Sequence, residues 1–434
     1  MLYSFVKKSQ LLFLFSFCVL IAAGTLLLKL PGVFPGELKW IDAVYTATSA
    51  VCVTGLSVVP ICEFTFIGQL IILLLIQIGG IGIVTLSASF VLFLGKHFSF
   101  NEKLMMSTLN DDFSLRNSEV LIKLVARYTM TCETVGAVII FAGNLIHGEK
   151  FFSALWHSIF IAIASFCNAG LSPYPDSVMS LSRISQFGSA LMILTGSLGI
   201  YVIYDIMQRF YGKRLFLHAY SKLVIWATAT LLVIAAFLFR HLGTTQGTML
   251  PWLDACYMAV SSCSAGYNSV QVDQLNDVSL VLCMFLMLVG GAPGSTAGGL
   301  KISTVAIAAA AIWNTITGNR QTIVFRRQIP QENVMKAFAV ITLFAILVVA
   351  GSIAVKLTNP NQDLGCLLFE SVSAICTVGL SIADTSAKMT LSGKIVTILL
   401  MYIGRIGPLT LLIFLLAREK PGKVQYPEER IIIG

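Results

Sequence analysis

The sequence predicts an all-α polytopic membrane protein with eight spanning helices, built from four parallel repeats around a pseudo-fourfold axis. Three observations predict this class. The 434 residues are 56% hydrophobic and only 12% charged, whereas a soluble domain needs more charge to cover its surface. Several apolar stretches reach or exceed the roughly 20 residues that cross a bilayer. A short glycine motif also recurs four times along the chain.

The first apolar stretch, residues 11–28, follows Lys7 and Lys8 as a signal peptide would. It is too long for the apolar core of a signal peptide and lacks a clear cleavage site before Lys29, so we expect a retained helix. The longest polar stretches, of about 25 residues, are too short to bury a core of their own. No separate soluble domain is therefore expected.

The ten cysteines are scattered through apolar segments without the paired spacing of metal ligands, and a disulfide framework is not expected inside a membrane. The five histidines are isolated, which favours satisfied or solvated side chains. The net charge of +8 could suggest nucleic acid, but the distribution of the basic residues described below argues for a membrane protein without a nucleic-acid partner.

Four segments share Cys-x-x-Gly followed by Leu or Tyr and then Ser or Asn. Their glycines lie 115, 96 and 113 residues apart (170−55, 266−170, 379−266). This regular self-similarity is typical of an internal repeat. The four copies are Cys52-Val53-Thr54-Gly55, Cys167-Asn168-Ala169-Gly170, Cys263-Ser264-Ala265-Gly266 and Cys376-Thr377-Val378-Gly379.

Each motif follows an apolar segment that is too short to span a bilayer and is flanked by two spanning candidates. Asp42 and Asp254 stand at the start of two short segments, where N-capping carboxylates are expected. The short segments are residues 41–51, 154–166, 252–262 and 364–375. The outer spans are predicted at 10–30, 119–146, 219–240 and 334–356, and the inner spans at 66–94, 187–210, 278–317 and 392–417.

The unit is therefore helix, half-helix, loop and helix. Because each unit crosses the membrane twice, all four copies share one orientation, unlike the inverted repeats of many carriers. The predicted boundaries are 1–95, 96–215, 216–325 and 326–417 for repeats one to four, with a cytoplasmic tail at 418–434.

The basic residues agree with this topology. With both termini in the cytoplasm, 19 Lys and Arg residues lie inside and eight lie outside, while Lys301 and Arg405 fall within membrane segments. An excess on one face is what the positive-inside rule expects. It places the glycine loops in the outer half of the membrane.

The loop chemistry fits a cation filter, which makes each unit a helix–pore loop–helix repeat around a pseudo-fourfold pore. A cation that enters the bilayer exchanges its water shell for other oxygens, and backbone carbonyls from four loops can supply them. Glycine tolerates the dihedrals that point carbonyls inward. The negative end of each half-helix dipole faces the cation. The alternative, that these are ordinary helix C-caps with coincidental Cys and Gly, would have to hold in four matching contexts.

With these motifs the chain resembles the Trk/Ktr/HKT superfamily of K⁺ transporters, and within it the Ktr-type membrane subunits. The resemblance covers about residues 10–417. Besides the filter motifs it rests on Gln77–Gly82, Gly290–Lys301 and Gly404–Pro408. It implies K⁺ uptake through a selectivity filter without an organic cofactor, in a bacterial inner membrane. It also implies a homodimer docked on a cytosolic nucleotide-binding ring of the RCK type.

Departures from the family pattern bear on selectivity. Leu171 stands where Phe is expected, and Cys263-Ser264 where Arg-Thr is frequent. In plant relatives, Ser in place of the first filter glycine accompanies Na⁺ selectivity, whereas Gly55 is present here. The resemblance thus favours K⁺, with a Na⁺-selective or Na⁺-coupled transporter of the same fold as the alternative.

Residues 290–301 interrupt an apolar span with five glycines and a proline, which break a helix. A nucleotide-binding loop is the competing interpretation, but the Gly-Lys-Ser/Thr ending is absent and no strand precedes it. The resemblance implies a gate beneath the filter, and a passive kink stays open. The expected gate residues are Gly290, Gly291, Gly294, Ser295, Thr296, Gly298, Gly299 and Lys301.

Arg405 lies in an apolar segment, where an unpaired charge costs at least ~2.5 kcal/mol. It is expected to form an electrostatic barrier in the pore, as its family counterpart is thought to do, or to pair with Glu133 or Glu370. A carrier with an alternating site stays open, whereas a membrane-embedded enzyme would need paired catalytic groups in the helices, and the sequence contains none.

Overall fold

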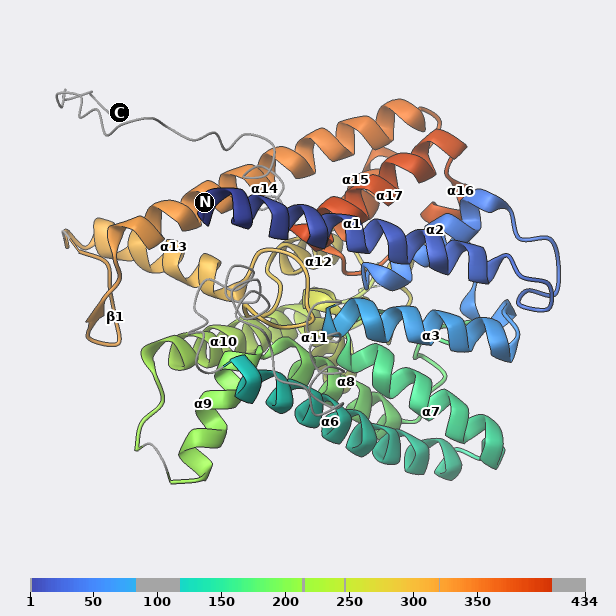
Figure 1. Ribbon diagram of the computed structural model, residues 1–434, viewed down its shortest axis with the longest axis horizontal. Helices are drawn as coiled ribbons and strands as arrows, with labels where there is room; N and C mark the ends of the chain where they lie inside the picture. The colour runs from blue at the N-terminus through green and yellow to red at the C-terminus, as the bar shows by residue number, and fades with distance from the viewer. Residues whose placement is uncertain (1, 83–117, 213–214, 246, 320, 408–434) are drawn as a thin grey trace.

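The structure, a computed structural model, describes residues 2–82, 118–212, 215–245, 247–319 and 321–407. The predicted tail at 418–434, Pro408 and the far ends of two inner spans lie outside the described residues. The regular structure is almost entirely helical, apart from a hairpin of β1 (Ile323–Val324) and β2 (Arg327–Gln328). Most helices run roughly along the long axis of the molecule, and the hairpin lies at one end of it (Figure 1).

The four outer helices begin and end within a few residues of the predicted spans, except for the earlier start of the first. They are α1 (Leu2–Leu28), α6 (Ser118–Ile146), α10 (Ala219–Leu242) and α14 (Gln331–Thr358). Figure 1 shows α14 and α6 along opposite edges of the molecule.

The four short segments form half-helices, as predicted. They are α2 (Trp40–Val51), α7 (Phe151–Phe166), α11 (Trp252–Ser264) and α15 (Leu364–Cys376). The prediction about their N-terminal acids was wrong. Asp42 and Asp254 are not caps, because Lys39 and Pro251 precede these helices without a side-chain hydrogen bond. Asp363 is the carboxylate that caps a half-helix, accepting from the backbone N–H groups of Gly365 and Cys366.

Asp42 and Asp254 instead form ion pairs with basic residues of other repeats. Lys394 lies 2.8 Å from Asp42, and Arg183 lies 2.6 Å from Asp254. Both carboxylates sit in the first turn of a half-helix, where its dipole also favours negative charge. These pairs hold two half-helices to the inner helices of the preceding repeats.

The inner helices share one start signal that the sequence analysis missed. Thr65, Ser182, Asn276 and Thr390 each precede an inner helix and accept a hydrogen bond from the backbone N–H three residues later. The helices that follow are α3 (Phe66–Ile81), α8 (Arg183–Ser197), α12 (Asp277–Leu288) and α17 (Leu391–Ile406). A Ser, Thr or Asn side chain at this position satisfies a backbone donor that the helix leaves free.

Three inner helices end at a glycine with positive φ, and the second continues after it. The predicted span at 187–210 is divided into α8 and α9 (Ile200–Phe210), which are bent by 96°. Gly199 lies at the break with φ 78°, and Gly82 and Gly407 have φ values of 85° and 89°. Glycine adopts these dihedrals at little cost. The third inner span is interrupted between α12 and α13 (Ile302–Ile316), as predicted.

The helices contact one another in a closed ring. Within each unit the outer helix contacts the half-helix and the inner helix, and the half-helix contacts the inner helix. Each half-helix also contacts the inner helix of the preceding unit, through the pairs α17–α2, α3–α7, α8–α11 and α12–α15. The last unit is thereby joined to the first.

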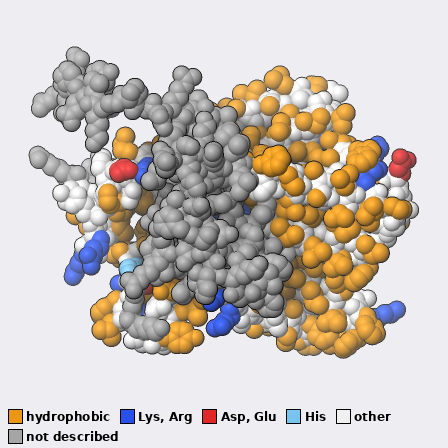
Figure 2. Space-filling view, in the orientation of Figure 1, with side chains coloured by type: hydrophobic (Ala, Val, Ile, Leu, Met, Phe, Trp, Pro, Cys, Tyr) orange, Lys and Arg blue, Asp and Glu red, His pale blue; other side chains and the backbone are white. Residues whose placement is uncertain are grey.

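The surface is typical of a protein that contacts lipid. Figure 2 shows hydrophobic side chains over much of the visible face, with charged side chains mainly toward the ends of the long axis. Among the described helices, Lys123–Ile146, Ala219–Leu242 and Gln331–Thr358 are long and apolar enough to cross a bilayer, and α8 with α9 form a fourth, bent candidate. The described helices therefore do not by themselves confirm eight spans.

Candidate functional site

The four glycine loops meet at the C-terminal ends of the half-helices. Every one of their glycines has positive φ: 96° at Gly55, 66° at Gly170, 72° at Gly266 and 100° at Gly379. L-residues with a side chain rarely adopt this conformation, so each position favours glycine.

Each loop glycine faces a carbonyl oxygen of the next loop in the ring. A Cβ atom added to the glycine would lie within 2.7 Å of that oxygen in every case. The oxygens belong to Ala169 beside Gly55, Ala265 beside Gly170, Val378 beside Gly266 and Thr54 beside Gly379. In each loop the carbonyl thus belongs to the residue before the glycine. The sequence-predicted loop residues are therefore brought together in one cyclic arrangement.

The third loop departs from the other three. Two residues before the glycine, Val53, Asn168 and Thr377 have φ values of 55°, 60° and 50°. Ser264, at the equivalent position, still belongs to α11. The left-handed conformation costs energy in a residue with a side chain, so three loops leave their half-helix through a strained turn and one does not.

Two loops carry a serine clamp that the sequence analysis missed. The hydroxyl oxygen of Ser49 accepts the backbone N–H of Gly55 at 3.1 Å, and that of Ser373 accepts the N–H of Gly379 at 3.0 Å. Loops two and three have Ala164 and Val260 at these positions, six residues before the glycine. The sequence does contain a signal for this contact, because a serine lies six residues before the glycine in two of the four repeats.

The oxygens near the loops are neutral. The hydroxyl oxygens of Thr54 and Thr377 are buried without a hydrogen-bond partner among the described residues. None of the four motifs contains Asp or Glu. Cys167 packs behind its loop, against Gly80 and with its thiol 3.5 Å from Gln77 Oε1. All ten cysteines are free. An arrangement of this kind offers dipoles, rather than formal charge, to a cation.

Residues 289–301 form a loop between α12 and α13 that is closed at its neck. Val289 and Leu300 form a parallel bridge, with the Gly290 N–H donating to the Leu300 carbonyl at 2.8 Å. The Ile302 N–H donates to the Gly291 carbonyl at 3.0 Å. Backbone hydrogen bonds therefore satisfy the base of a non-helical segment at membrane depth, as such a segment requires.

The tip of this loop contacts two glycine loops that are not neighbours in the ring. A Cβ atom added to Gly298 would lie 1.8 Å from Thr377 Oγ1 in loop four. On the other side, the Thr296 hydroxyl lies 3.0 Å from the carbonyl oxygen of Phe166, at the end of α7. Asn168 Nδ2 of loop two donates to the same hydroxyl at 2.6 Å.

The remaining expected gate residues serve the loop itself or its neighbours. Lys301 Nζ donates to the Ala297 carbonyl at 2.6 Å, so the ammonium group binds the backbone of its own loop. Gly291 approaches Ser197 at the end of α8, and Gly294 approaches Ile200 at the start of α9. The backbone N–H of Ile200 donates to the Gly294 carbonyl at 3.2 Å. Ser295 Oγ is buried without a partner among the described residues, and Gly299 has a φ of 67°.

Arg405 lies in the last turn of α17 and binds backbone carbonyls. Its guanidinium donates to the Thr296 carbonyl at 2.7 Å and to the Gly79 carbonyl at 2.6 Å. The alternative of a pair with Glu133 or Glu370 was wrong. Gln77 Nε2 donates to Glu133 at 2.8 Å, and the Ser386 hydroxyl donates to Glu370. The positive charge is therefore solvated by peptide dipoles of the 289–301 loop and of α3.

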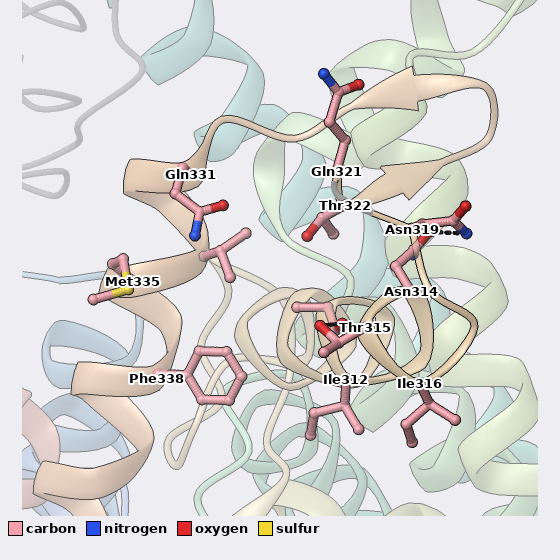
Figure 3. A pocket seen from close by; sticks show the side chains of 12 residues that line it. Ile312, Asn314, Thr315, Ile316, Asn319, Gln321, Thr322, Gln331, Met335 and Phe338 are labelled. Atoms are coloured by element: carbon pink, nitrogen blue, oxygen red, sulfur yellow. Dashed lines mark hydrogen bonds between the residues drawn. The ribbon is translucent and has the colours of Figure 1, made fainter. Parts of the chain in front are cut away.

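A separate hollow of about 400 Å³ lies between α13, α14 and the segment that joins α13 to β1 (Figure 3). Its polar lining consists of amide and hydroxyl side chains such as Asn314, Asn319 and Gln331, over apolar residues such as Phe338. None of the predicted site residues lines it, and its lining has no charged side chain. It has no part in the loop arrangement.

Comparison with known proteins places this arrangement in context. The family model described as TrkH, cation transport protein, matches residues 16–423. The chain is 32% identical to the Ktr system potassium uptake protein B of Vibrio alginolyticus, over 97% of this chain and 94% of the relative. It is 36% identical to the potassium/sodium uptake protein NtpJ of Enterococcus hirae, over 96% of this chain and 95% of the relative.

Among solved structures, the potassium transporter TrkH from Vibrio parahaemolyticus has a similar fold. The TM-score is 0.70 at 19% sequence identity, with 95% of this chain and 85% of the other covered. At this identity the match concerns the fold alone.

Proposed function

Because the chain belongs to the TrkH family of cation transport proteins, we propose that it takes up K⁺ across a cell membrane through a channel-like selectivity filter. The observation that carries the proposal is the cyclic contact of the four loops. Each loop glycine faces the carbonyl oxygen that precedes the glycine of the next loop. The printed names of the Vibrio and Enterococcus relatives support potassium as the ion.

The filter replaces the water of the ion with main-chain oxygens. Carbonyls such as those of Thr54, Ala169, Ala265 and Val378 lie at the ends of four half-helices, whose negative dipole ends converge on the loops. Because no carboxylate belongs to the loops, discrimination depends on where these oxygens are held rather than on net charge. The unpartnered hydroxyls of Thr54 and Thr377 add further neutral oxygens.

The pore is then a pseudo-fourfold assembly of four parallel repeats with eight spanning helices, divided at about residues 95, 215 and 325. Both termini face the cytoplasm and the filter faces outward. In that orientation the membrane potential drives K⁺ inward with ~2.3 kcal/mol per charge per 100 mV.

The 290–301 loop is the gate, and Arg405 is a barrier beneath the filter. The loop reaches from filter loop two to filter loop four, so it crosses the path of an ion that leaves the filter. The guanidinium of Arg405 holds the loop by the Thr296 carbonyl. An ion can pass only after both have moved aside.

The functional unit is a homodimer in a bacterial inner membrane, regulated by a cytosolic ring of nucleotide-binding RCK-type subunits. The name of the Vibrio relative, protein B of a Ktr system, supports a further component, and the family resemblance implies the dimer and the ring.

A Na⁺-selective or Na⁺-coupled transporter of the same fold is the second candidate. It is favoured by the Enterococcus relative, whose name includes sodium. An alternating-site carrier would differ from both, because it would show no open-channel conductance in planar bilayers.

The test is ⁸⁶Rb⁺ uptake into proteoliposomes, competed by K⁺ and by Na⁺, with and without a regulatory subunit. We expect uptake that K⁺ abolishes at far lower concentration than Na⁺. The Phe152→Ala variant is the control, because this side chain is 83% exposed on the outside of α7. Uptake that Na⁺ competes as well as K⁺ would favour the second candidate, and no uptake would contradict both.

A further inference from the structure

One side chain links the second filter loop to the loop beneath the filter. Asn168 Nδ2 donates to Thr296 Oγ1 at 2.6 Å, and Asn168 Oδ1 accepts the Ser264 hydroxyl at 3.0 Å. The amide is nearly fully buried. It therefore connects filter loop two with the 289–301 loop on one side and with filter loop three on the other.

Thr296 is the meeting point of these contacts. Its hydroxyl accepts from Asn168 and donates its one proton toward the carbonyls of Phe166 at 3.0 Å and Gly196 at 3.1 Å. Its own carbonyl accepts from Arg405 at 2.7 Å. A displacement of Thr296 consequently breaks the contact with loop two and the contact with Arg405 together.

Loop two lacks the serine contact that fastens loops one and four. Loops one and four are fastened to their own half-helices by Ser49 and Ser373, whereas loop two has Ala164 at that position. Asn168 also has a left-handed φ of 60°, a conformation that Asn tolerates better than most residues. Besides the backbone hydrogen bond from the Ala169 N–H to the Ala164 carbonyl, loop two is thus held by the Asn168 side chain, between Thr296 and Ser264.

We propose that Asn168 is a positioning residue that makes ion selectivity depend on the position of the 289–301 loop, through its contact with Thr296. With Thr296 in place, loop two holds the Ala169 carbonyl at its position in the ring. When Thr296 moves away, that carbonyl gains freedom, and discrimination between K⁺ and Na⁺ falls. The inference deepens the proposed function and rests on it.

The test compares ⁸⁶Rb⁺ and ²²Na⁺ uptake by proteoliposomes of the full chain. Thr296→Val and Asn168→Ala should each lower the Rb⁺/Na⁺ uptake ratio about fivefold, the change expected from one ordinary hydrogen bond. The double variant should show no further loss, because both substitutions remove the same contact. Thr296→Ser keeps the hydroxyl and should keep the ratio.

Phe152→Ala is the matched control. Its side chain is 83% exposed and takes no part in the contact between Asn168 and Thr296, so the variant should keep the Rb⁺/Na⁺ ratio. If Asn168→Ala cannot be purified, Thr296→Ala also removes the hydroxyl and should lower the ratio as much as Thr296→Val.

Multiplying effects of Asn168→Ala and Thr296→Val, or an unchanged ratio in Thr296→Val, would overturn this inference alone. Absence of Rb⁺ uptake by the unaltered protein would overturn the proposed function, and the inference with it.

Discussion

In repeats one, two and four the inner helix packs against the half-helix of its own repeat. In repeat three the inner helix packs against a loop at the corresponding position. Gly79, Gly196 and Gly404 each lie 14 residues after the cap of their helix (79−65, 196−182, 404−390). A Cβ atom at any of them would lie 1.9–2.0 Å from a carbonyl oxygen near the end of a half-helix. These contacts fix the inner helix against the base of its filter loop.

Gly290 has the same spacing from its cap (290−276), but its close neighbour is different. A Cβ atom there would lie 1.9 Å from the Gly298 carbonyl of the 289–301 loop. Three residues further on, Pro293 replaces the glycine found at 82, 199 and 407. The 289–301 loop thus occupies the place that the end of a half-helix has beside the other three inner helices. We infer that this repeat is the one in which the base of the filter can move while the remaining scaffold stays fixed.

The largest effect is expected when a side chain is added at one of the glycines that pack against a half-helix. Gly196→Ala brings a Cβ to 1.9 Å from the Phe166 carbonyl oxygen, where backbone must shift. Overpacking of this kind costs about 1–3 kcal/mol or more. We expect a markedly lower melting temperature in detergent and little Rb⁺ uptake.

Gly290→Ala creates an equally short contact, but with the 289–301 loop. We expect it to displace the loop, raise Rb⁺ uptake and lower the melting temperature much less. Equal losses of stability in the two variants would remove the distinction between the third repeat and the others.

Shortening the 290–301 loop should raise flux next most strongly, because the segment between filter loops two and four is then gone. Initial rates of ⁸⁶Rb⁺ uptake, normalised to the amount of inserted protein, measure this. A lower or unchanged rate would speak against the gate.

Gly55→Ser should reduce the discrimination of K⁺ from Na⁺. Its Cβ would approach the Ala169 carbonyl oxygen at 2.7 Å, at a φ of 96° that favours glycine. The oxygen must move, and the ring opens on one side. Uptake ratios in a strain deficient in K⁺ transport measure the change, and unchanged ratios would count against the filter assignment.

The smallest effect is expected from Ser373→Ala. It removes one hydrogen bond to the Gly379 N–H, worth about 1 kcal/mol. The K⁺/Na⁺ ratio should fall by a few-fold at most, with the melting temperature nearly unchanged. A loss as large as that of Gly55→Ser would show that the Ser373 hydrogen bond matters as much as the glycine, against this ranking.

The half-helices and glycine loops could be predicted because the same pattern occurs four times, which makes a weak local signal specific. The break at Gly199 could not, since the run at 187–210 is mostly apolar and its three glycines do not by themselves distinguish a kink from a packed helix. The partners of Arg405 could not be predicted either, because every residue has a backbone carbonyl and the sequence does not show which ones a side chain will bind.

Asp42 and Asp254 show the same limit. Their position in a first turn was visible, but their partners Lys394 and Arg183 lie 352 and 71 residues away. Only the closed ring of repeats brings these residues together. The local chemistry was therefore predictable, and the contacts between repeats were not.

The most direct test of the central claim is to locate Rb⁺ or Tl⁺ in the protein by anomalous diffraction. The account predicts an ion on the ring axis, in contact with the carbonyl oxygens of Thr54, Ala169, Ala265 and Val378. Ions found only elsewhere, with these four oxygens uncoordinated, would contradict it.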